Sequence, residues 1–81
     1  MTQRKSRATQ YVVCIDNHGY PASLELHKIY RVLPDEAAAA DGDMRVVDES
    51  GEDYLYAADR FVEIEPPQTV KRSLLHVAKA A

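Results

Sequence analysis

The chain contains no tryptophan, a single cysteine and only three glycines among its 81 residues. One cysteine, Cys14, excludes an internal disulfide, and no Cys-x-x-Cys or His-x₃-His pair supplies the convergent ligands of a zinc site. Three glycines are too few for a phosphate-cradling loop. No apolar run reaches the roughly 18 residues needed to cross a bilayer, and residues 1–10 lack the hydrophobic segment of a secretory signal. We therefore expect a cytoplasmic protein without cofactor, metal or membrane segment.

The small size of the chain argues against catalysis. Its 81 residues leave room for one domain, which buries only about 60 % of its unfolded surface, so a deep substrate cavity is not expected. Cys14 lies in an apolar run typical of an inert core cysteine, and the histidines are not paired with a candidate nucleophile. The chain also shows no signature of an oxyanion hole. We therefore expect a protein that is not an enzyme.

Charge is distributed unevenly along the chain. Residues 1–10 and residues 67–81 each carry three cations and no acid, whereas residues 11–66 hold all 13 acids against four basic residues, a net charge of −9. An acidic body repels phosphate backbones and favours cationic partners, so nucleic-acid binding by the body itself is disfavoured. The alternative interpretation is that the acids keep a small domain soluble.

Two parts of the sequence align with each other at an offset of 32 residues: residues 14–19 face residues 46–51, and residues 28–34 face residues 60–66. Each part has the pattern of a strand, a glycine turn and a second strand. A solenoid needs at least three such repeats. The alignment therefore indicates two similar β-units that close on one small core.

Local patterns predict five strands, over residues 11–16, 28–33, 44–48, 53–57 and 61–65. Leu24 and Leu26 alternate with polar residues and should share one face of an extended segment. Asp35 and Gly42 bracket four alanines and should cap one or two helical turns. Residues 58–60 suit a 3₁₀ turn. These elements form a body over residues 11–66, preceded by a disordered basic tail over residues 1–10.

Residues 67–81 predict a C-terminal helix or tail. An amphipathic helix over residues 68–81 would place Val70, Leu74 and Val77 on one apolar face. That face could dock on the body, mediate a weak homodimer of an otherwise monomeric protein, or receive a partner.

The order of these elements resembles the SH3-like small barrel. Residues 24–33 resemble the passage from the first long loop of that fold into its second strand, and residues 54–64 resemble its fourth strand, 3₁₀ turn and fifth strand. The chain is also similar to small bacterial proteins of unassigned function that have this barrel. The resemblance implies an all-β, five-stranded barrel and brings no activity with it. SH3 domains that bind polyproline use an aromatic groove that includes a tryptophan, which this chain lacks.

The tyrosines provide the main candidate binding surface. Tyr54 and Tyr56 are two residues apart on a predicted strand and share a face, whereas Leu55 points to the other face. If Leu55 faces the core, both tyrosines are exposed near Tyr20 of the first long loop, beside Glu52 and Asp53. Such a surface suits arginine, lysine or methylated ammonium groups through cation–π contacts of roughly 0.5–2 kcal/mol each. Alternatively, the rings cover a thin barrel wall or lie under the C-terminal helix.

Acidic residues cluster at two turns of the predicted body. The first cluster flanks Ser50-Gly51 and comprises Asp48, Glu49, Glu52 and Asp53; the second lies in residues 35–43 and comprises Asp35, Glu36, Asp41 and Asp43. Neither spacing matches the Ca²⁺-binding loop pattern. We therefore expect solvated, charged turns.

The leading functional hypothesis is a non-catalytic adaptor that binds a basic or helical segment of a partner protein. Its candidate binding residues are Tyr20, Tyr54, Tyr56, Glu52 and Asp53, and the alternative partner-binding face is that of Val70, Leu74 and Val77. A second hypothesis is a small nucleic-acid-associated barrel that uses its basic ends, whose binding would weaken steeply with salt.

Overall fold

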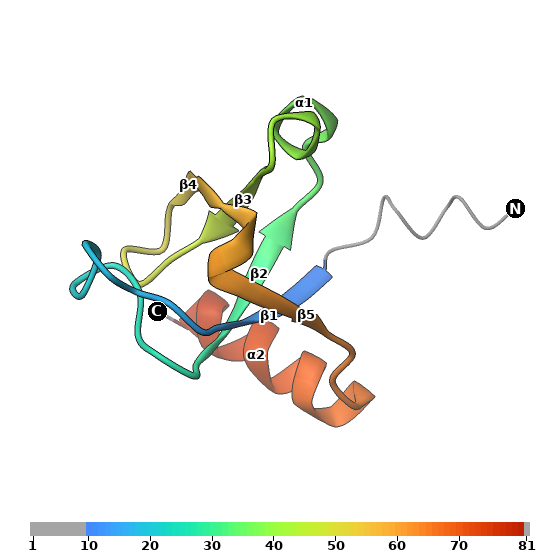
Figure 1. Cartoon of the computed structure of the whole chain (residues 1–81). Coiled ribbons are helices and arrows are strands. Elements are labelled where there is room, and N and C mark those ends of the chain that lie inside the picture. Colours follow the sequence, from blue (N-terminus) through green and yellow to red (C-terminus); the bar gives the residue numbers. More distant parts are fainter. Residues whose placement is uncertain (1–9, 81) are drawn as a thin grey trace, which may run out of the picture.

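The computed structural model describes the backbone of residues 10–80 and side chains as far as residue 74 (Figure 1). The elements follow in the order β1 (Gln10–Cys14), β2 (Ile29–Leu33), α1 (Glu36–Ala40), β3 (Asp43–Val47), β4 (Asp53–Ala57), the 3₁₀ helix η2 (Ala58–Arg60), β5 (Phe61–Ile64) and α2 (Gln68–Ala80). The five strands form one antiparallel sheet in the order β4-β3-β2-β1-β5. The predicted mainly β fold is therefore confirmed. Of the predicted basic tail, residues 1–9 lie outside the described residues, and Gln10 belongs to β1.

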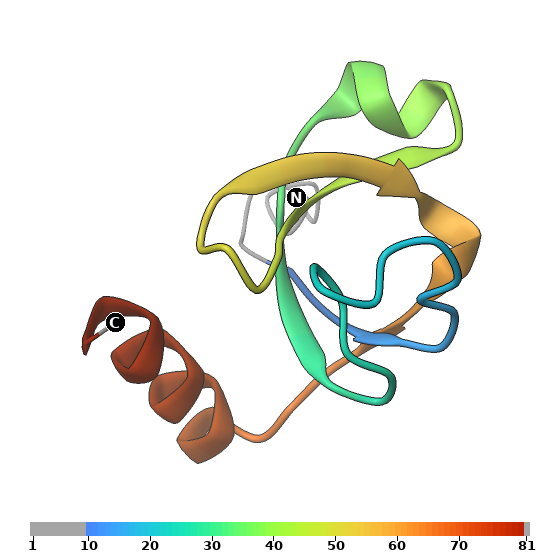
Figure 2. The same ribbon diagram turned by 90° about the vertical axis from the view of Figure 1, so that its left-hand side faces the viewer.

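The sheet curves around a single core. Figure 2 shows the strands bending around one side, which we call the inner face. Every second residue of the strands points to this face, as the two-residue period of a strand requires. The core consists of Val12, Cys14, Leu24, Tyr30, Val32, Val46, Tyr56 and Phe61, with Met44 partly buried against it. Strands β4 and β5 form the two edges of the sheet and are not paired with each other, so the sheet is open.

The first loop, residues 15–28, covers the core without being extended. Leu24 is completely buried in it, whereas Leu26 is 45 % exposed, so the prediction that both leucines share a face is wrong. The reason is that the backbone turns at this point: the amides of Ser23 and Leu24 both donate to the carbonyl of Tyr20, at 3.1 and 2.9 Å. A two-residue alternation holds only along an extended backbone.

Helix α1 fills the connection between β2 and β3 and begins as predicted. The Asp35 carboxylate accepts a hydrogen bond from the Ala38 amide at 3.0 Å, which is the geometry of an N-cap. Gly42 adopts a φ of 80°, a left-handed conformation that favours glycine after a helix end. The bond from Ala38, assisted by Arg45, lowers the pKa of Asp35. The predicted helical turn and its N-cap Asp35 are therefore confirmed, whereas the C-cap is Asp41 and Gly42 is the residue that follows it.

Helix α2 lies beside the outer face of the sheet, behind β1 and β2 in Figure 1. Leu74 lines a groove of about 280 Å³ together with the outer-face residues Tyr11, Ile29 and Val47. Val70 is 36 % exposed, and the side chain of Val77 lies outside the described residues. The predicted C-terminal helix is confirmed, and its side chain at position 74 faces the protein's own sheet. Within residues 10–80, no helix is long and apolar enough to cross a membrane.

Candidate functional site

The three candidate tyrosines occupy different environments. Tyr56 is 6 % exposed and belongs to the core, whereas Tyr20 is 41 % and Tyr54 50 % exposed. The pairing of β4 with β3 sets Tyr56 opposite Met44 and Tyr54 opposite Val46, so both point to the inner face, and Leu55 points outward. The interpretation that Leu55 faces the core and exposes both tyrosines is therefore wrong. Tyr56 instead lies in the core, on the inner face of the sheet.

Tyr56 anchors an aromatic group across the core. Its ring makes edge contacts with Tyr20, at 5.0 Å between centroids, and with Phe61, at 6.1 Å. Its hydroxyl donates to the carboxylate of Asp48 at 2.5 Å. Tyr56 thereby fixes the ring of Tyr20, from the first loop, against the strand that carries Tyr54.

Asp48 is an internal acceptor instead of a solvated turn residue. It is 5 % exposed, and its carboxylate also accepts hydrogen bonds from the amide and hydroxyl of Ser50, at 2.9 and 2.6 Å. The prediction of a solvated charge is wrong for Asp48, because the turn folds its carboxylate back towards Tyr56. Burial alone would raise the pKa of Asp48, but the hydrogen bonds from Ser50 and Tyr56 outweigh it and lower that pKa. The carboxylate therefore stays ionised and bonded at neutral pH.

Ionisation of Tyr56 should destabilise the fold in alkali. Burial, and secondly the hydrogen bond to Asp48, raises the pKa of Tyr56 from 10.0 to about 12. A group whose pKa is higher in the folded chain stabilises the fold fully below its unfolded pKa and loses that contribution as pH rises through the folded value. We expect the free energy of unfolding, measured by urea denaturation, to fall between about pH 10 and pH 12. The decline should be smaller in Tyr56→Phe, and an identical decline in that variant would contradict this assignment.

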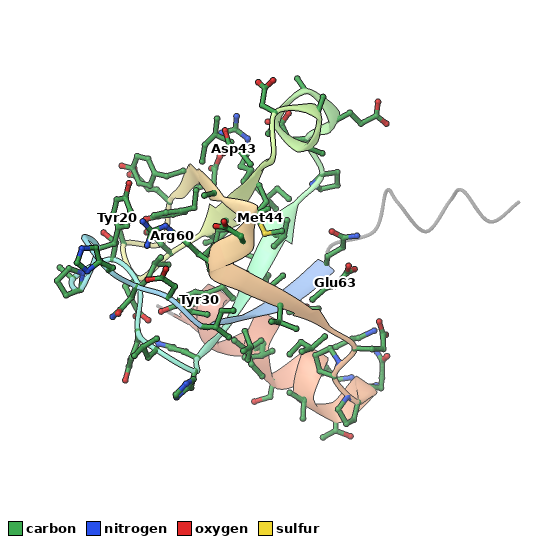
Figure 3. The ribbon with its side chains drawn as sticks, in the orientation of Figure 1. Tyr20, Tyr30, Asp43, Met44, Arg60 and Glu63 are labelled. Carbon is green, nitrogen blue, oxygen red and sulfur yellow. The ribbon has the colours of Figure 1, made fainter. Side chains whose placement is uncertain are left out.

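Arg60 clamps the first loop onto η2. Its guanidinium carbon lies 4.8 Å from the ring centroid of Tyr20, and its Nη1 atom donates to the carbonyls of Asp16 and His18, at 3.2 and 2.9 Å. Figure 3 shows Arg60 and Tyr20 next to each other. One face of the Tyr20 ring is thus occupied by the protein's own cation. A ligand therefore has to approach Tyr20 from another side.

A second contact ties the first loop to the β3–β4 turn. The hydroxyl of Tyr30 donates to the Glu49 carboxylate and accepts from the Glu25 amide, at 2.5 and 2.7 Å. Lys28 pairs with the same carboxylate at 2.8 Å. The sequence analysis did not identify this group, because 19 residues separate Tyr30 from Glu49 and no local pattern joins them.

The remaining predicted residues define a smaller site than the sequence indicates. Glu52 is exposed and accepts a hydrogen bond from the hydroxyl of Tyr54 at 3.1 Å, which raises the pKa of Tyr54. The carboxylate of Asp53 instead bonds to Arg45 at 3.0 Å, on the outer face. The exposed candidate residues on the inner-face side are therefore Tyr20, Glu52 and Tyr54, which we call the tyrosine surface.

The described residues were also compared with the requirements of a metal site. Among the described residues, no group of three or more histidine, cysteine or acidic side chains could hold a metal ion. Comparison with protein families, curated proteins and solved structures found no match to this chain. The function is therefore argued from the site alone.

Proposed function

We propose that this protein is a non-catalytic interaction module with an SH3-like architecture, which binds a basic segment of a partner protein on the tyrosine surface. The architecture is supported by five short antiparallel strands, a long first loop, a helical turn in the second connection and a 3₁₀ helix before the last strand. A fold of this kind carries no activity by itself. The proposal therefore depends on the surface.

The observation that carries the proposal is the arrangement of rings at that surface. Two half-exposed tyrosines, Tyr20 and Tyr54, accompany the buried Tyr56, and the carboxylate of Glu52 is held by the hydroxyl of Tyr54. Rings beside an anion attract cationic side chains through the ring face and the charge together. The intramolecular contact of Arg60 with the ring of Tyr20 supports this preference for a guanidinium.

The charge balance of the body adds long-range attraction. Three of its four basic residues, Lys28, Arg45 and Arg60, are engaged in ion pairs with acids of the same chain. The acids of residues 11–66 outnumber these basic partners, which leaves the body with a net charge of −9. Such a field accelerates encounter with a cationic segment and makes binding sensitive to salt.

Removing the exposed ring should weaken binding without unfolding the protein. We expect Tyr54→Ala to raise the Kd for a nine-residue peptide with three arginines among alanines by roughly 3- to 10-fold, since one exposed cation–π contact is worth about 0.5–1 kcal/mol and the ring also contributes contact area. Fluorescence anisotropy of a labelled peptide measures this change. The matched control is Leu55→Ala, which removes a 46 % exposed side chain from the opposite face of the same strand. Equal affinities of Tyr54→Ala and the unchanged protein would exclude the tyrosine surface as the binding site.

A further inference from the structure

A second concave site lies at the end of the sheet next to α1. It is an open pocket of about 630 Å³, and none of its lining residues belongs to the tyrosine surface. Its apolar floor is formed by Val32, Leu33, Pro34, Met44 and Ala58. This volume is within the range of small-ligand sites. The pocket therefore has room for a long side chain.

Small side chains form part of the pocket lining. Helix α1 presents Ala39 to the opening, while its one buried residue is Ala38. Met44 is only partly buried, although it packs against the core residues. A thioether side chain is flexible and polarisable and adapts to different apolar groups. The floor is therefore suited to receive methylene groups.

The rim of the pocket is acidic. Asp35, Glu36, Asp43 and Arg45 line it, so its net charge is −2. Arg45 is engaged by Asp35 at 2.8 Å and by Asp53 at 3.0 Å. Within residues 10–74, neither Glu36 nor Asp43 has an ion-pair partner. Two carboxylates therefore remain available to a bound cation.

A further exposed carboxylate lies on β5, outside the lining of the pocket. The pairing of β1 with β5 sets Glu63 opposite Val12, and Glu63 is exposed. In the orientation of Figure 3, Met44 lies between Asp43 and Glu63.

We propose that this pocket binds a lysine or arginine side chain from a basic segment of a partner protein. The methylene groups of the side chain would lie on Met44 and Ala39, and its charged head would reach Glu36 and Asp43 at the rim. Long cationic side chains bury their stems along apolar surface and keep their charged ends near water, which is the pattern that this pocket complements. The inference does not depend on the tyrosine surface.

The test follows the Met44 methyl signal and the Ala39 amide by NMR in the presence of a five-residue peptide with one lysine among alanines. We expect saturable shifts of both signals, with a Kd on the order of 1 mM, as a single shallow contact allows. The same peptide with norleucine in place of lysine keeps the stem but lacks the charge and should bind several-fold more weakly. Absence of shifts up to about 10-fold above that Kd, or equal shifts with both peptides, would overturn the proposal.

Two kinds of substitution test the acidic rim of the pocket and the space inside it separately. Glu36→Gln combined with Asp43→Asn should weaken lysine binding by roughly 5- to 20-fold, since each exposed ion pair accounts for about 2- to 5-fold. Glu25→Gln makes the same chemical change in the first loop and should leave the affinity unchanged. Ala39→Phe retains the charge but occupies the mouth of the pocket, and should abolish the Met44 shift. Undiminished binding by Ala39→Phe would overturn the assignment.

Two further variants identify the occupant and separate this site from the tyrosine surface. Tyr54→Ala should leave the Met44 shift unchanged, so failure of one proposal does not imply failure of the other. The chain's own basic residues Arg4, Lys5 and Arg7 precede Gln10, which itself lines the pocket. Replacing all three by glutamine should not move the Met44 signal in the absence of peptide. A shift would show that this segment occupies the pocket, and would overturn its assignment to a partner.

Discussion

Tyr56→Ala should lower the free energy of unfolding by about 3–5 kcal/mol, the usual range for truncating a buried aromatic ring. The ring is 6 % exposed, contacts two other aromatic rings, and its hydroxyl is the donor to the buried carboxylate of Asp48. A domain of this size has a net stability of only about 3–5 kcal/mol. We therefore expect the variant to be largely unfolded at 25 °C, as measured by circular dichroism during urea denaturation.

Tyr54→Ala is the matched control for this substitution. It removes the same side chain two residues away on the same strand, where the ring is 50 % exposed. Tyr54→Ala should lower the free energy of unfolding by less than about 1 kcal/mol, because truncation of an exposed side chain leaves no cavity. Similar losses for the two variants would contradict the register of β4 on β3. Tyr56→Phe isolates the hydroxyl and should cost about 1–3 kcal/mol, since the buried Asp48 then lacks one of its donors.

Leu24→Ala should lower the free energy of unfolding by about 2–5 kcal/mol, although this leucine lies in a loop. Its side chain is completely buried in the core, and the loop that carries it makes no strand pairing that could compensate. Leu26→Ala, at a 45 % exposed position two residues along the chain, should change stability by less than about 0.5 kcal/mol. Thermal or urea denaturation of both variants measures the difference. Equal losses of stability in the two variants would contradict the burial of Leu24 in the core.

The strands and turns of this protein could be predicted because they depend on local patterns. All five predicted strands lie within two residues of their positions in the structure, and the 3₁₀ helix at residues 58–60 matches the prediction. Asp35 could be identified as a cap, since capping joins groups three residues apart. The closing of the sheet into an SH3-like barrel remains part of the proposal, because β4 and β5 are unpaired.

The orientation of β4 could not be predicted from its own residues. Periodicity shows that Tyr54 and Tyr56 share a face, but both faces of this strand carry large side chains, and tyrosine suits core and surface alike. The register with β3 decides between the faces by placing Tyr56 opposite Met44. Burial of Asp48 follows from the same register, because its partner Tyr56 lies eight residues away across the hairpin.

The pocket next to α1 was also outside the reach of sequence analysis. Its floor combines Val32, Met44 and Ala58, which belong to three separate elements of the chain. Which acids stay free depends on ion pairs such as that of Arg45 with Asp35, ten residues apart. The sequence could show the excess of acids, but not which of them remain available to a ligand.

The most direct test of the proposed function is ¹H–¹⁵N chemical-shift mapping with the arginine nonapeptide at low and high salt. We expect amide shifts to concentrate at Tyr20, Glu52 and Tyr54, to saturate, and to weaken as salt screens the acidic body. A contradictory result would be shifts absent from these three positions, or preferential binding of a single-stranded DNA of nine nucleotides through the basic ends of the chain. Saturable shifts at the three positions would place partner recognition on the tyrosine surface, whereas preferential binding of the DNA would favour the nucleic-acid alternative.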